Sequence, residues 1–393
     1  MPNSGFSLAE NGERGGGRVS ISRLTLTDFR NYAGLRLDLD PRPVVLTGAN
    51  GAGKTNLLEA VSYLTPGRGL RAAQLDSVIR LGAGAFAVAA GVDRRAGGPD
   101  VGAIDIGTGF RRGDSGRVVR VNHEPAPSVS VLGEIVRALW LTPAMDGLFT
   151  GPASDRRRFL DRLVLTLDPG HASRVADFEK AMRQRNRLLE DFRGNDRWLG
   201  SVEHAMAELG VAVSTARAGA VRRLTEALRQ RAGGVFPDPE IAIEGAFETG
   251  AGDQRPSLEV EEAYREELGL GRARDAAAGR TLSGPHRSDL SVIHRGRGVP
   301  AALASTGEQK GLLIALILAH ARLVADASGG VAPLLLLDEI AAHLDDMRRS
   351  ALFAEILALG AQAWMTGTDR ALFTDIAADA QCLEVADGRL SPV

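Results

Sequence analysis

Apolar and polar residues alternate along the first third of the chain with the period of two that is typical of half-buried β-strands. Four segments with this pattern predict strands: residues 19–29, 35–40, 85–92 and 101–106. The glycine-rich residues 97–99 and 107–116 predict turns. Residues 1–18 are rich in glycine, serine and asparagine, so we expect a flexible tail before the first strand.

The pattern changes near residue 155 to the spacing of amphipathic helices. Residues 158–165 predict a first helix, and residues 172–192 and 198–232 predict two long ones. Because Gly194-Asn195-Asp196 interrupts the long pattern, the two helices should form an antiparallel hairpin. At about 1.5 Å per residue, its first arm would be only about 30 Å long.

The last third of the chain combines helices with wholly apolar strands. Helices are predicted at residues 312–325 and 350–359, and buried strands at residues 333–337 and 361–366. The chain is therefore predicted to be an α/β protein that is split by a helical insertion. The predicted parts are a tail (1–18), an N-terminal half (19–150), a helical insertion (151–278) and a C-terminal half (279–393).

Composition agrees with a globular protein of two or three domains. The chain has 393 residues, of which 44% are hydrophobic and 24% charged, and a formal net charge of −2. No apolar run approaches the roughly 18 residues that a membrane span needs, and the start lacks the pattern of a signal peptide. The single Cys382 excludes an internal disulfide framework and a cysteine-rich metal site. We therefore expect a cytoplasmic protein without a membrane partner.

Lysine is rare in this chain: of 47 basic residues, the lysines are Lys54, Lys180 and Lys310. Lys54 lies in GANGAGKT, which matches the phosphate-binding P-loop pattern G-x-x-x-x-G-K-S/T. An apolar strand at 42–47 precedes this run and a helix follows it, which argues against a chance match. In a P-loop, backbone N–H groups bind phosphate oxygens, the lysine bridges the β- and γ-phosphates, and the next hydroxyl faces Mg²⁺. The predicted nucleotide-binding residues of this run, with Lys54 also catalytic, are Gly48, Asn50, Gly51, Gly53, Lys54, Thr55 and Asn56.

An apolar strand that ends in two carboxylates supplies the expected second half of such a site. Residues 334–337 are four leucines, and Asp338 and Glu339 follow them. We assign Asp338, with Thr55, to the shell of a Mg²⁺ ion and Glu339 to the general base that activates water. Gln74, twenty positions after Lys54, is a further candidate for metal contact, and it fits a surface glutamine equally well.

Residues 305–309, Ser-Thr-Gly-Glu-Gln, open a predicted helix and resemble the S-x-G-Q/E-Q signature of ABC-type ATPases. That resemblance implies that the signature engages the γ-phosphate held by a second subunit. The residues involved would be Ser305, Gly307, Glu308 and Gln309. An ordinary helix-capping box explains the same residues when they are taken alone, and Ala304 stands where the family has leucine. The position of the run before the Asp338 strand favours the signature, and Asp345 matches the D-loop that usually follows.

The P-loop and the signature lie far apart in sequence, since Thr55 and Ser305 are separated by 250 positions that include the short hairpin. This split resembles the SMC and RecF branch of ABC-type ATPases, and the short arms favour the RecF family. Four further runs resemble RecF proteins: residues 28–32, 67–71, 156–161 and 283–290. The resemblance covers residues 19–390, and it implies that Arg30 and Asn31 belong to the ATP site. Residues 366–369 lack the switch histidine that ABC ATPases usually carry, which resemblance to RecF makes expected.

Resemblance to RecF implies a split ABC-type ATPase head that binds ATP and Mg²⁺. Two protomers would close head to tail around two ATP molecules and form a basic surface for duplex DNA. A weak, DNA-stimulated hydrolysis of ATP would then release the DNA. The resemblance also implies action at single-strand gaps and single-strand/double-strand junctions with RecR and RecO, where the protein helps to load the recombinase.

Arginines cluster in three places, and such patches suit the binding of a phosphate backbone. The candidates for DNA contact are Arg111, Arg112, Arg156, Arg157, Arg183 and Arg185. A lysine-poor chain that fills its surface with arginine explains the clusters equally well. His286, in a Gly-Pro-His-Arg turn, is expected to brace that turn rather than to act in catalysis.

Three other functions share parts of this pattern. An ATPase subunit of an ABC transporter would dock on a membrane partner, but the hairpin insertion and the missing switch histidine argue against it. An SMC-like protein that bridges distant DNA segments would need longer arms. A metabolic kinase is the weakest alternative, because it has no use for a signature at residues 305–309.

Overall fold

The computed structural model describes residues 17–95, 102–190, 196–231, 233–245 and 256–393. The predicted tail up to residue 16, the glycines at 97–99 and the hairpin break at Gly194-Asn195 lie outside the described residues. Among the described residues, no helix is both long enough and apolar enough to cross a membrane.

The first part of the chain forms an antiparallel sheet with the strand order β2-β1-β4-β5-β6-β7. Its strands are β1 (Arg18–Phe29), β2 (Tyr32–Asp38), β4 (Ala85–Arg95), β5 (Ala103–Arg111), β6 (Val118–Val121) and β7 (Glu124–Pro125). Strands β1, β2, β4 and β5 confirm the four predicted strands within the described residues. In β1 the alternating residues Leu24 and Leu26 are buried, as the period of two predicts. The turn predicted at 107–116 starts too early, since β5 continues to Arg111 and buries Phe110 against Phe86 of β4.

The second sheet carries the site, and its strand order is β15-β14-β3-β13-β12-β8. Its strands are β3 (Val44–Thr47), β8 (Ala138–Leu141), β12 (Leu334–Leu337), β13 (Ala363–Gly367), β14 (Gln381–Ala386) and β15 (Arg389–Pro392). Every neighbouring pair is parallel except β14 and β15. The ends of β3, β13 and β12 therefore lie at one edge of the sheet.

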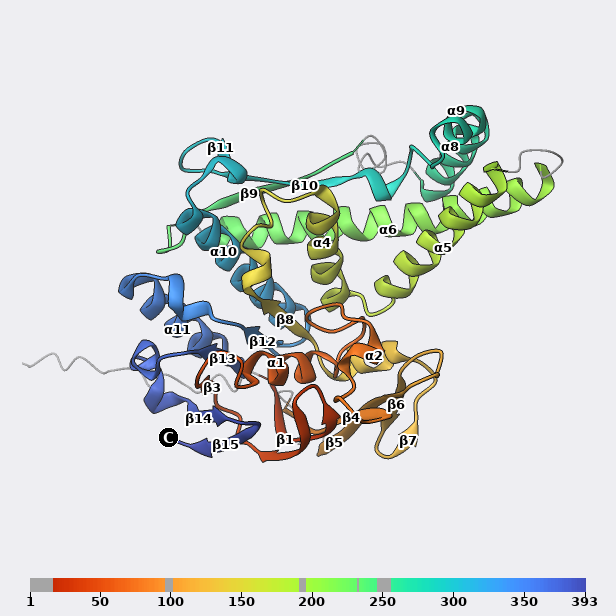
Figure 1. Cartoon of the computed structure of the whole chain (residues 1–393). Coiled ribbons are helices and arrows are strands. Elements are labelled where there is room, and N and C mark those ends of the chain that lie inside the picture. The colour runs from red at the N-terminus through yellow and green to blue at the C-terminus, as the bar shows by residue number, and fades with distance from the viewer. Residues whose placement is uncertain (1–16, 96–101, 191–195, 232, 246–255) are drawn as a thin grey trace, which may run out of the picture.

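Helices connect and cover these sheets, as Figure 1 shows. The helices of the head are α1 (Lys54–Ser62), α2 (Leu75–Val78), α3 (Leu132–Ile135), α10 (Thr306–Ala327) and α11 (Asp346–Leu359). Helix α10 is buried along most of its length, as its run of apolar residues predicts. This arrangement confirms the predicted split α/β head.

The helical insertion comprises α4 (Ala153–Leu167), α5 (His171–Glu190), α6 (Asp196–Gln230), α8 (Ser257–Leu270) and α9 (Arg272–Ala278). Helices α5 and α6 pack together as the predicted hairpin, and its arms have 20 and 35 residues, close to the predicted lengths. The longer arm returns into the head (Figure 1), where Leu224 and Leu228 share a core with α4 and α10.

A third sheet joins the insertion to the C-terminal half, which the predicted boundary at 278/279 does not anticipate. It has the order β11-β10-β9 and consists of β9 (Pro239–Glu244), β10 (Asp289–His294) and β11 (Val299–Pro300). Strand β9 precedes the boundary and pairs antiparallel with β10, which follows it. Because backbone hydrogen bonds cross residue 278, that boundary does not separate two independent units.

Candidate functional site

The P-loop joins the end of β3 to α1, and two of its glycines have no room for a side chain. Gly48 has φ +144°, and a Cβ there would collide with the carbonyl oxygen of Val385. Gly53, the residue before α1, has φ +112°, and a Cβ would lie 2.6 Å from Nδ2 of Asn31. Glycine is therefore required at both positions by backbone conformation and by close approach.

Lys54 is buried over this loop. Its Nζ donates hydrogen bonds to the carbonyl oxygens of Gly48 (2.7 Å) and Ala49 (2.9 Å). Burial lowers the pKa of Lys54, while the negative charges of Glu339 and Asp338 oppose this shift. An ammonium whose acceptors are neutral carbonyls keeps a net charge that a phosphate can neutralise.

Thr55 and Asp338 meet although 283 positions separate them in sequence. The hydroxyl of Thr55 donates to the Asp338 carboxylate at 2.9 Å and 3.0 Å. This contact follows from the sheet order, because the strand before Thr55 and the strand before Asp338 flank β13 and end at the same edge. A hydroxyl and a carboxylate are hard oxygen ligands that suit Mg²⁺, and nucleotide phosphates and water would complete its shell. The described residues contain no group of three or more His, Cys, Asp or Glu side chains that could hold a metal ion.

Thr366, on β13, belongs to the same cluster and was not among the predicted site residues. Its hydroxyl donates to Asp338 at 2.7 Å and accepts a hydrogen bond from the backbone N–H of Glu339 at 2.9 Å. The residue lies in the segment where ABC ATPases carry their switch histidine, and a threonine at the end of a central strand is the signal that could have identified it. It fixes both acidic residues relative to the sheet.

Glu339 has φ +50°, a left-handed conformation that non-glycine residues rarely adopt. It is the second residue after β12 and is half-buried. Such a conformation costs about 1–3 kcal/mol and is found where surrounding contacts enforce it, often at functional sites. The hydrogen bond to Thr366 is one such contact.

Asn31 and Asn56 are brought to the P-loop as the resemblance implies. Nδ2 of Asn56 donates to Oδ1 of Asn31 (2.8 Å), and Nδ2 of Asn31 donates to the carbonyl of Ala52 (3.3 Å). The Tyr32 hydroxyl donates to the carbonyl of Gly53 at 3.1 Å, and burial raises the pKa of this phenol. The turn between β1 and β2 therefore rests directly on the P-loop. Arg30 of this turn lines an open groove of about 740 Å³ beside it.

Gln74 lies immediately before α2 with an exposed side chain. Within the part of the chain that the structure describes, no hydrogen bond joins this side chain to Thr55 or Asp338. Its contact with a metal stays a prediction.

The signature segment forms a complete capping box at the start of α10. Ser305 Oγ accepts from the backbone N–H of Glu308 (3.3 Å), and the Glu308 carboxylate accepts from the N–H of Ser305 (2.8 Å). Gln309 Nε2 donates to the carbonyl of Ala304 at 2.9 Å. The ordinary cap and the signature are thus compatible in one segment.

Ser305 is exposed and Gly307 is half-exposed, beside the 73% exposed side chain of Leu303. Among the described residues, no hydrogen bond or ion pair joins residues 305–309 to the P-loop of the same chain. Asp345 caps α11 by accepting from the N–H of Arg348 at 2.8 Å, and Arg348 lies next to Gly307. The predicted signature and D-loop are therefore neighbours on one surface.

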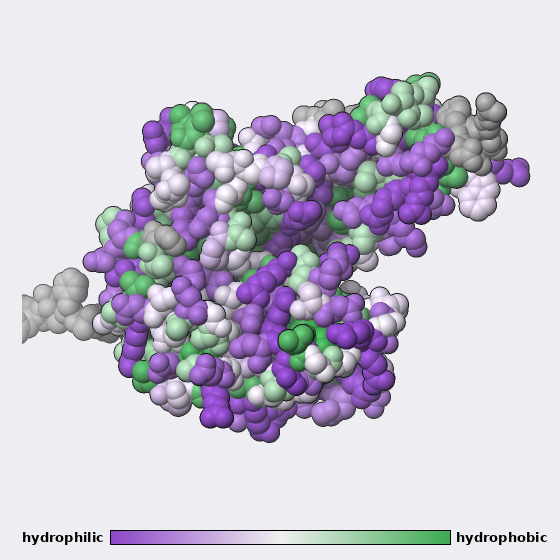
Figure 2. Space-filling model, in the orientation of Figure 1, coloured by the Kyte–Doolittle hydropathy of each residue, from purple (hydrophilic) through white to green (hydrophobic). Residues whose placement is uncertain are grey.

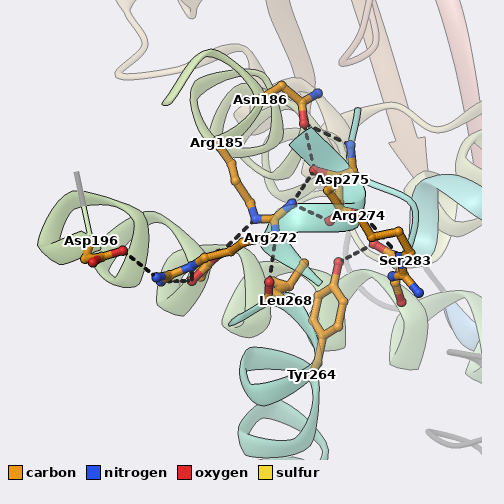
Figure 3. A network of polar contacts seen from close by, with 11 residues as sticks. Arg185, Asn186, Asp196, Tyr264, Leu268, Arg272, Arg274, Asp275 and Ser283 are labelled. Atoms are coloured by element: carbon orange, nitrogen blue, oxygen red, sulfur yellow. Dashed lines mark hydrogen bonds and ion pairs between the residues drawn. The ribbon is translucent and has the colours of Figure 1, made fainter. Parts of the chain in front are cut away.

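Arg185 was predicted as a DNA contact, and this is wrong. Its guanidinium is fully buried and donates to Glu203 of α6, to Asp275 of α9 and to the Leu268 carbonyl at the end of α8. Figure 3 shows Arg185 inside this network. Since its donors are engaged inside the protein, it cannot reach a phosphate.

Arg156 is partly buried, and its guanidinium is engaged within the protein. Its guanidinium makes a bidentate pair with Asp289 (2.8 Å and 2.7 Å), and its remaining nitrogen donates to the carbonyl of Gly151 at 2.6 Å. The pair with Asp289 raises the pKa of Arg156, so the charge is fixed and neutralised in place. These contacts argue against a DNA contact of Arg156, which stays a prediction.

The other arginine candidates remain open predictions. Arg111 is exposed, the side chain of Arg112 is 63% exposed and that of Arg183 is 58% exposed. Arg157 is half-buried and donates to the carbonyl of Ser288 at 2.7 Å. On the face shown in Figure 2, hydrophilic residues predominate both on the head and on the helical arm.

Two residues without a firm assignment have structural contacts. His286 Nε2 lies 3.0 Å from the carbonyl oxygen of Thr281, and burial lowers the pKa of its ring. This contact agrees with a brace of the Gly-Pro-His-Arg turn. Lys310 is buried after the signature, and its Nζ lies 3.4 Å from Oδ2 of Asp146.

Comparison with known proteins places this architecture in a family. The family model for the RecF/RecN/SMC N terminal domain matches residues 20–386. The DNA replication and repair protein RecF of Brucella abortus (strain 2308) is 56% identical over 384 residues, which cover 97% of this chain and 98% of that protein. This chain belongs to the RecF family. The RecF of Rhizobium meliloti (strain 1021) is 54% identical over 95% of this chain and 99% of its own length.

Solved structures agree with the RecF fold. The recombination mediator protein RecF, solved with ATPrS, superimposes with a TM-score of 0.83 at 21% identity and covers 96% of this chain and 99% of its own. An Smc head domain with an extended coiled coil from Pyrococcus furiosus reaches a TM-score of 0.53 at 15% identity, with 96% of each chain covered. These likenesses show the split ATPase head, with RecF as the nearer of these two shapes.

Proposed function

We propose that this chain is an ATP-dependent DNA-binding protein of DNA replication and repair. The observation that carries the proposal is the contact between Thr55 and Asp338, because it assembles a P-loop and an acidic strand end into one site for Mg²⁺-ATP. The RecF relatives are described as DNA replication and repair proteins, and this supports the DNA part of the proposal.

ATP would lie with its phosphates along residues 48–55, where the N–H groups and Lys54 neutralise the β- and γ-phosphates. Mg²⁺ held by Thr55 and Asp338 would supply further positive charge at these phosphates. Glu339 would take a proton from the attacking water. The water oxygen then bonds to the γ-phosphorus while the bond to the β–γ bridging oxygen breaks, which gives ADP and phosphate. We expect this hydrolysis to be weak and stimulated by DNA.

A second protomer would complete the site. The signature residues Ser305 and Gly307 are accessible and make no polar contact with the P-loop of their own chain in the described residues. Two copies that close head to tail would place each signature on the γ-phosphate of the other copy, and a two-fold pair would bury two ATP molecules. Closure would align the exposed arginines of both copies for duplex DNA.

The proposed partners follow from the family. A structure of RecF with ATP is described as part of the RecFOR pathway. We infer that this chain acts with RecR and RecO at single-strand gaps and junctions, where it helps to load the recombinase. These relatives favour this function over a transporter subunit.

Sedimentation of wild type and Glu339→Gln with Mg²⁺-ATP tests the proposal. Glu339→Gln should stay dimeric for longer than wild type, because ATP binds but is not hydrolysed. Binding to gapped and blunt duplex DNA should rise with ATP in both proteins. A chain that stays monomeric with ATP, or whose DNA binding ignores ATP, would contradict the mechanism.

A further inference from the structure

Glu59 is a carboxylate in the middle of the P-loop helix with no exposed surface. Two arginines neutralise it. Arg30 of the β1–β2 turn makes a bidentate pair (2.9 Å and 2.6 Å), and Nη1 of Arg71 donates at 2.7 Å. A fully buried carboxylate is retained at considerable desolvation cost, and removing its charge leaves its cations without a partner.

The contacts of Glu59 continue to the P-loop. Nη1 of Arg71 also donates to Oδ1 of Asn56 at 2.7 Å. Asn56 in turn donates to Asn31, and Asn31 donates to the carbonyl of Ala52 in the P-loop. A chain of polar contacts therefore runs from the buried carboxylate through both sides of the groove to the phosphate loop.

Arg30 occupies the first of the two residues that connect β1 and β2, with φ +55°. This position of a two-residue hairpin turn favours glycine, which adopts a positive φ without strain. An arginine here carries conformational strain, which the bidentate pair with Glu59 offsets. Its side chain is thus held at the groove at a conformational cost.

The groove has the size and chemistry for the nucleoside end of a nucleotide. Its volume is about 740 Å³, and its walls include Arg30, Asn31, Asn56, Arg71 and Ile79. Amide groups can bond the edges of a base and ribose hydroxyls, and a planar guanidinium can stack on a base. The side chains of Arg30 and Arg71 are 19% and 39% exposed, so part of each faces the groove.

We propose that Glu59 is a positioning residue, which fixes Arg30 and Arg71 so that this groove receives the base and ribose of a nucleotide whose phosphates lie on the P-loop. The inference rests on the proposed ATP binding and adds that different residues bind the triphosphate and the nucleoside. Lys54 and the loop bind the triphosphate, whereas Glu59 acts on affinity for the nucleoside without touching it.

Calorimetric titrations with ATP and with inorganic tripolyphosphate, both with Mg²⁺, separate these two contributions. Glu59→Gln keeps the side-chain volume and removes the charge. We expect ATP binding to weaken about tenfold or more, with tripolyphosphate binding unchanged within about twofold. Glu59→Gln that binds ATP like wild type would overturn the inference, and so would equal weakening for both ligands, which indicates general damage to the P-loop.

Arg71→Ala provides the same test without a buried substitution, and it decides the question if Glu59→Gln does not fold. It should show the same selective loss of ATP affinity. Arg23→Ala is the matched control, because Arg23 is 41% exposed and pairs with Asp105 in the same sheet. Equal losses in Arg71→Ala and Arg23→Ala would overturn the inference. A wild type that binds neither ligand would instead refute the proposed ATP binding on which the inference rests.

Discussion

Two polar clusters in this protein use the same kinds of residue for different ends. At the edge of the central sheet, Lys54 and Asp338 lie near each other but bond to neutral groups of the protein, namely carbonyls and hydroxyls. In the helical insertion, Arg185 bonds directly to Glu203 and Asp275, which are both buried. Figure 3 shows Arg185 beside Asp275. The charges of the first cluster are not paired within the part of the protein that the structure describes, so a phosphate and a metal ion can bind to them. The charges of the second cluster are paired with each other and hold helices together.

The difference teaches how to interpret arginine in this chain. Arg183 and Arg185 stand two positions apart in one predicted basic cluster, yet the side chain of Arg183 is 58% exposed and that of Arg185 is buried. Along a helix, two positions correspond to opposite faces. A basic cluster in sequence therefore contains both surface charges and internal ion pairs, and their neighbours decide which is which.

The largest effect is expected on stability, from a change in the second cluster around Arg185. Arg185→Ala leaves Asp275 without its short ion pair, so we expect the free energy of unfolding to fall by about 3–5 kcal/mol. Chemical denaturation followed by circular dichroism measures this change. Arg183→Ala is the matched control and should change stability by less than about 0.5 kcal/mol. If Arg185→Ala kept wild-type stability but lost DNA binding, the assignment of Arg185 to the interior would be wrong.

The next largest effect is expected in the first cluster, at Lys54. Lys54→Ala should lower ATP hydrolysis by about 10²–10³-fold, because it removes a cation aimed at the developing phosphate charge. ATP-driven dimerisation should disappear as well, since the shared site needs bound nucleotide. Steady-state hydrolysis and sedimentation with ATP measure both. A Lys54→Ala protein that still dimerises with ATP would show that the nucleotide site is not shared.

A smaller effect separates the two roles of Ser305. Ser305→Ala removes the helix cap and should lower the free energy of unfolding by about 1 kcal/mol. It should also abolish ATP-dependent dimerisation. Ser305→Asp keeps a capping oxygen but adds a negative charge that repels the γ-phosphate. It should therefore retain stability and still fail to dimerise, as thermal unfolding and sedimentation can establish. Normal dimerisation of Ser305→Asp would mean that the segment is a cap alone.

The smallest effect concerns single surface arginines. If Arg112 contacts a DNA phosphate, Arg112→Ala should weaken binding and reduce the slope of log affinity against log salt by about 1. Arg36→Ala serves as a control, because Arg36 is exposed and pairs with Asp38. Fluorescence titrations across salt concentrations measure both slopes. Equal slopes for Arg112→Ala and wild type would remove Arg112 from the DNA surface.

Much of the cluster around Lys54 and Asp338 could be predicted because its proposed chemistry is local. A phosphate loop needs glycines and a lysine in fixed order, and a metal-binding strand needs an acid at its end, so Lys54, Thr55 and Asp338 are recognisable in sequence. Thr366 and Glu59 were not predicted as site residues. A threonine at the end of a central strand was the one signal for Thr366, whereas Glu59 acquires its role only through partners far away in the chain.

The sequence by itself determined the α/β class, the P-loop, the acidic strand end and the resemblance to RecF, since each rests on short runs of residues or on the order of such runs along the chain. The tertiary structure alone decided that Arg185 is buried, that Arg156 pairs with Asp289, and that β9 and β10 join across the expected boundary. It also decided that two arginines neutralise Glu59. The physical reason is that burial and charge pairing depend on which distant segments pack together.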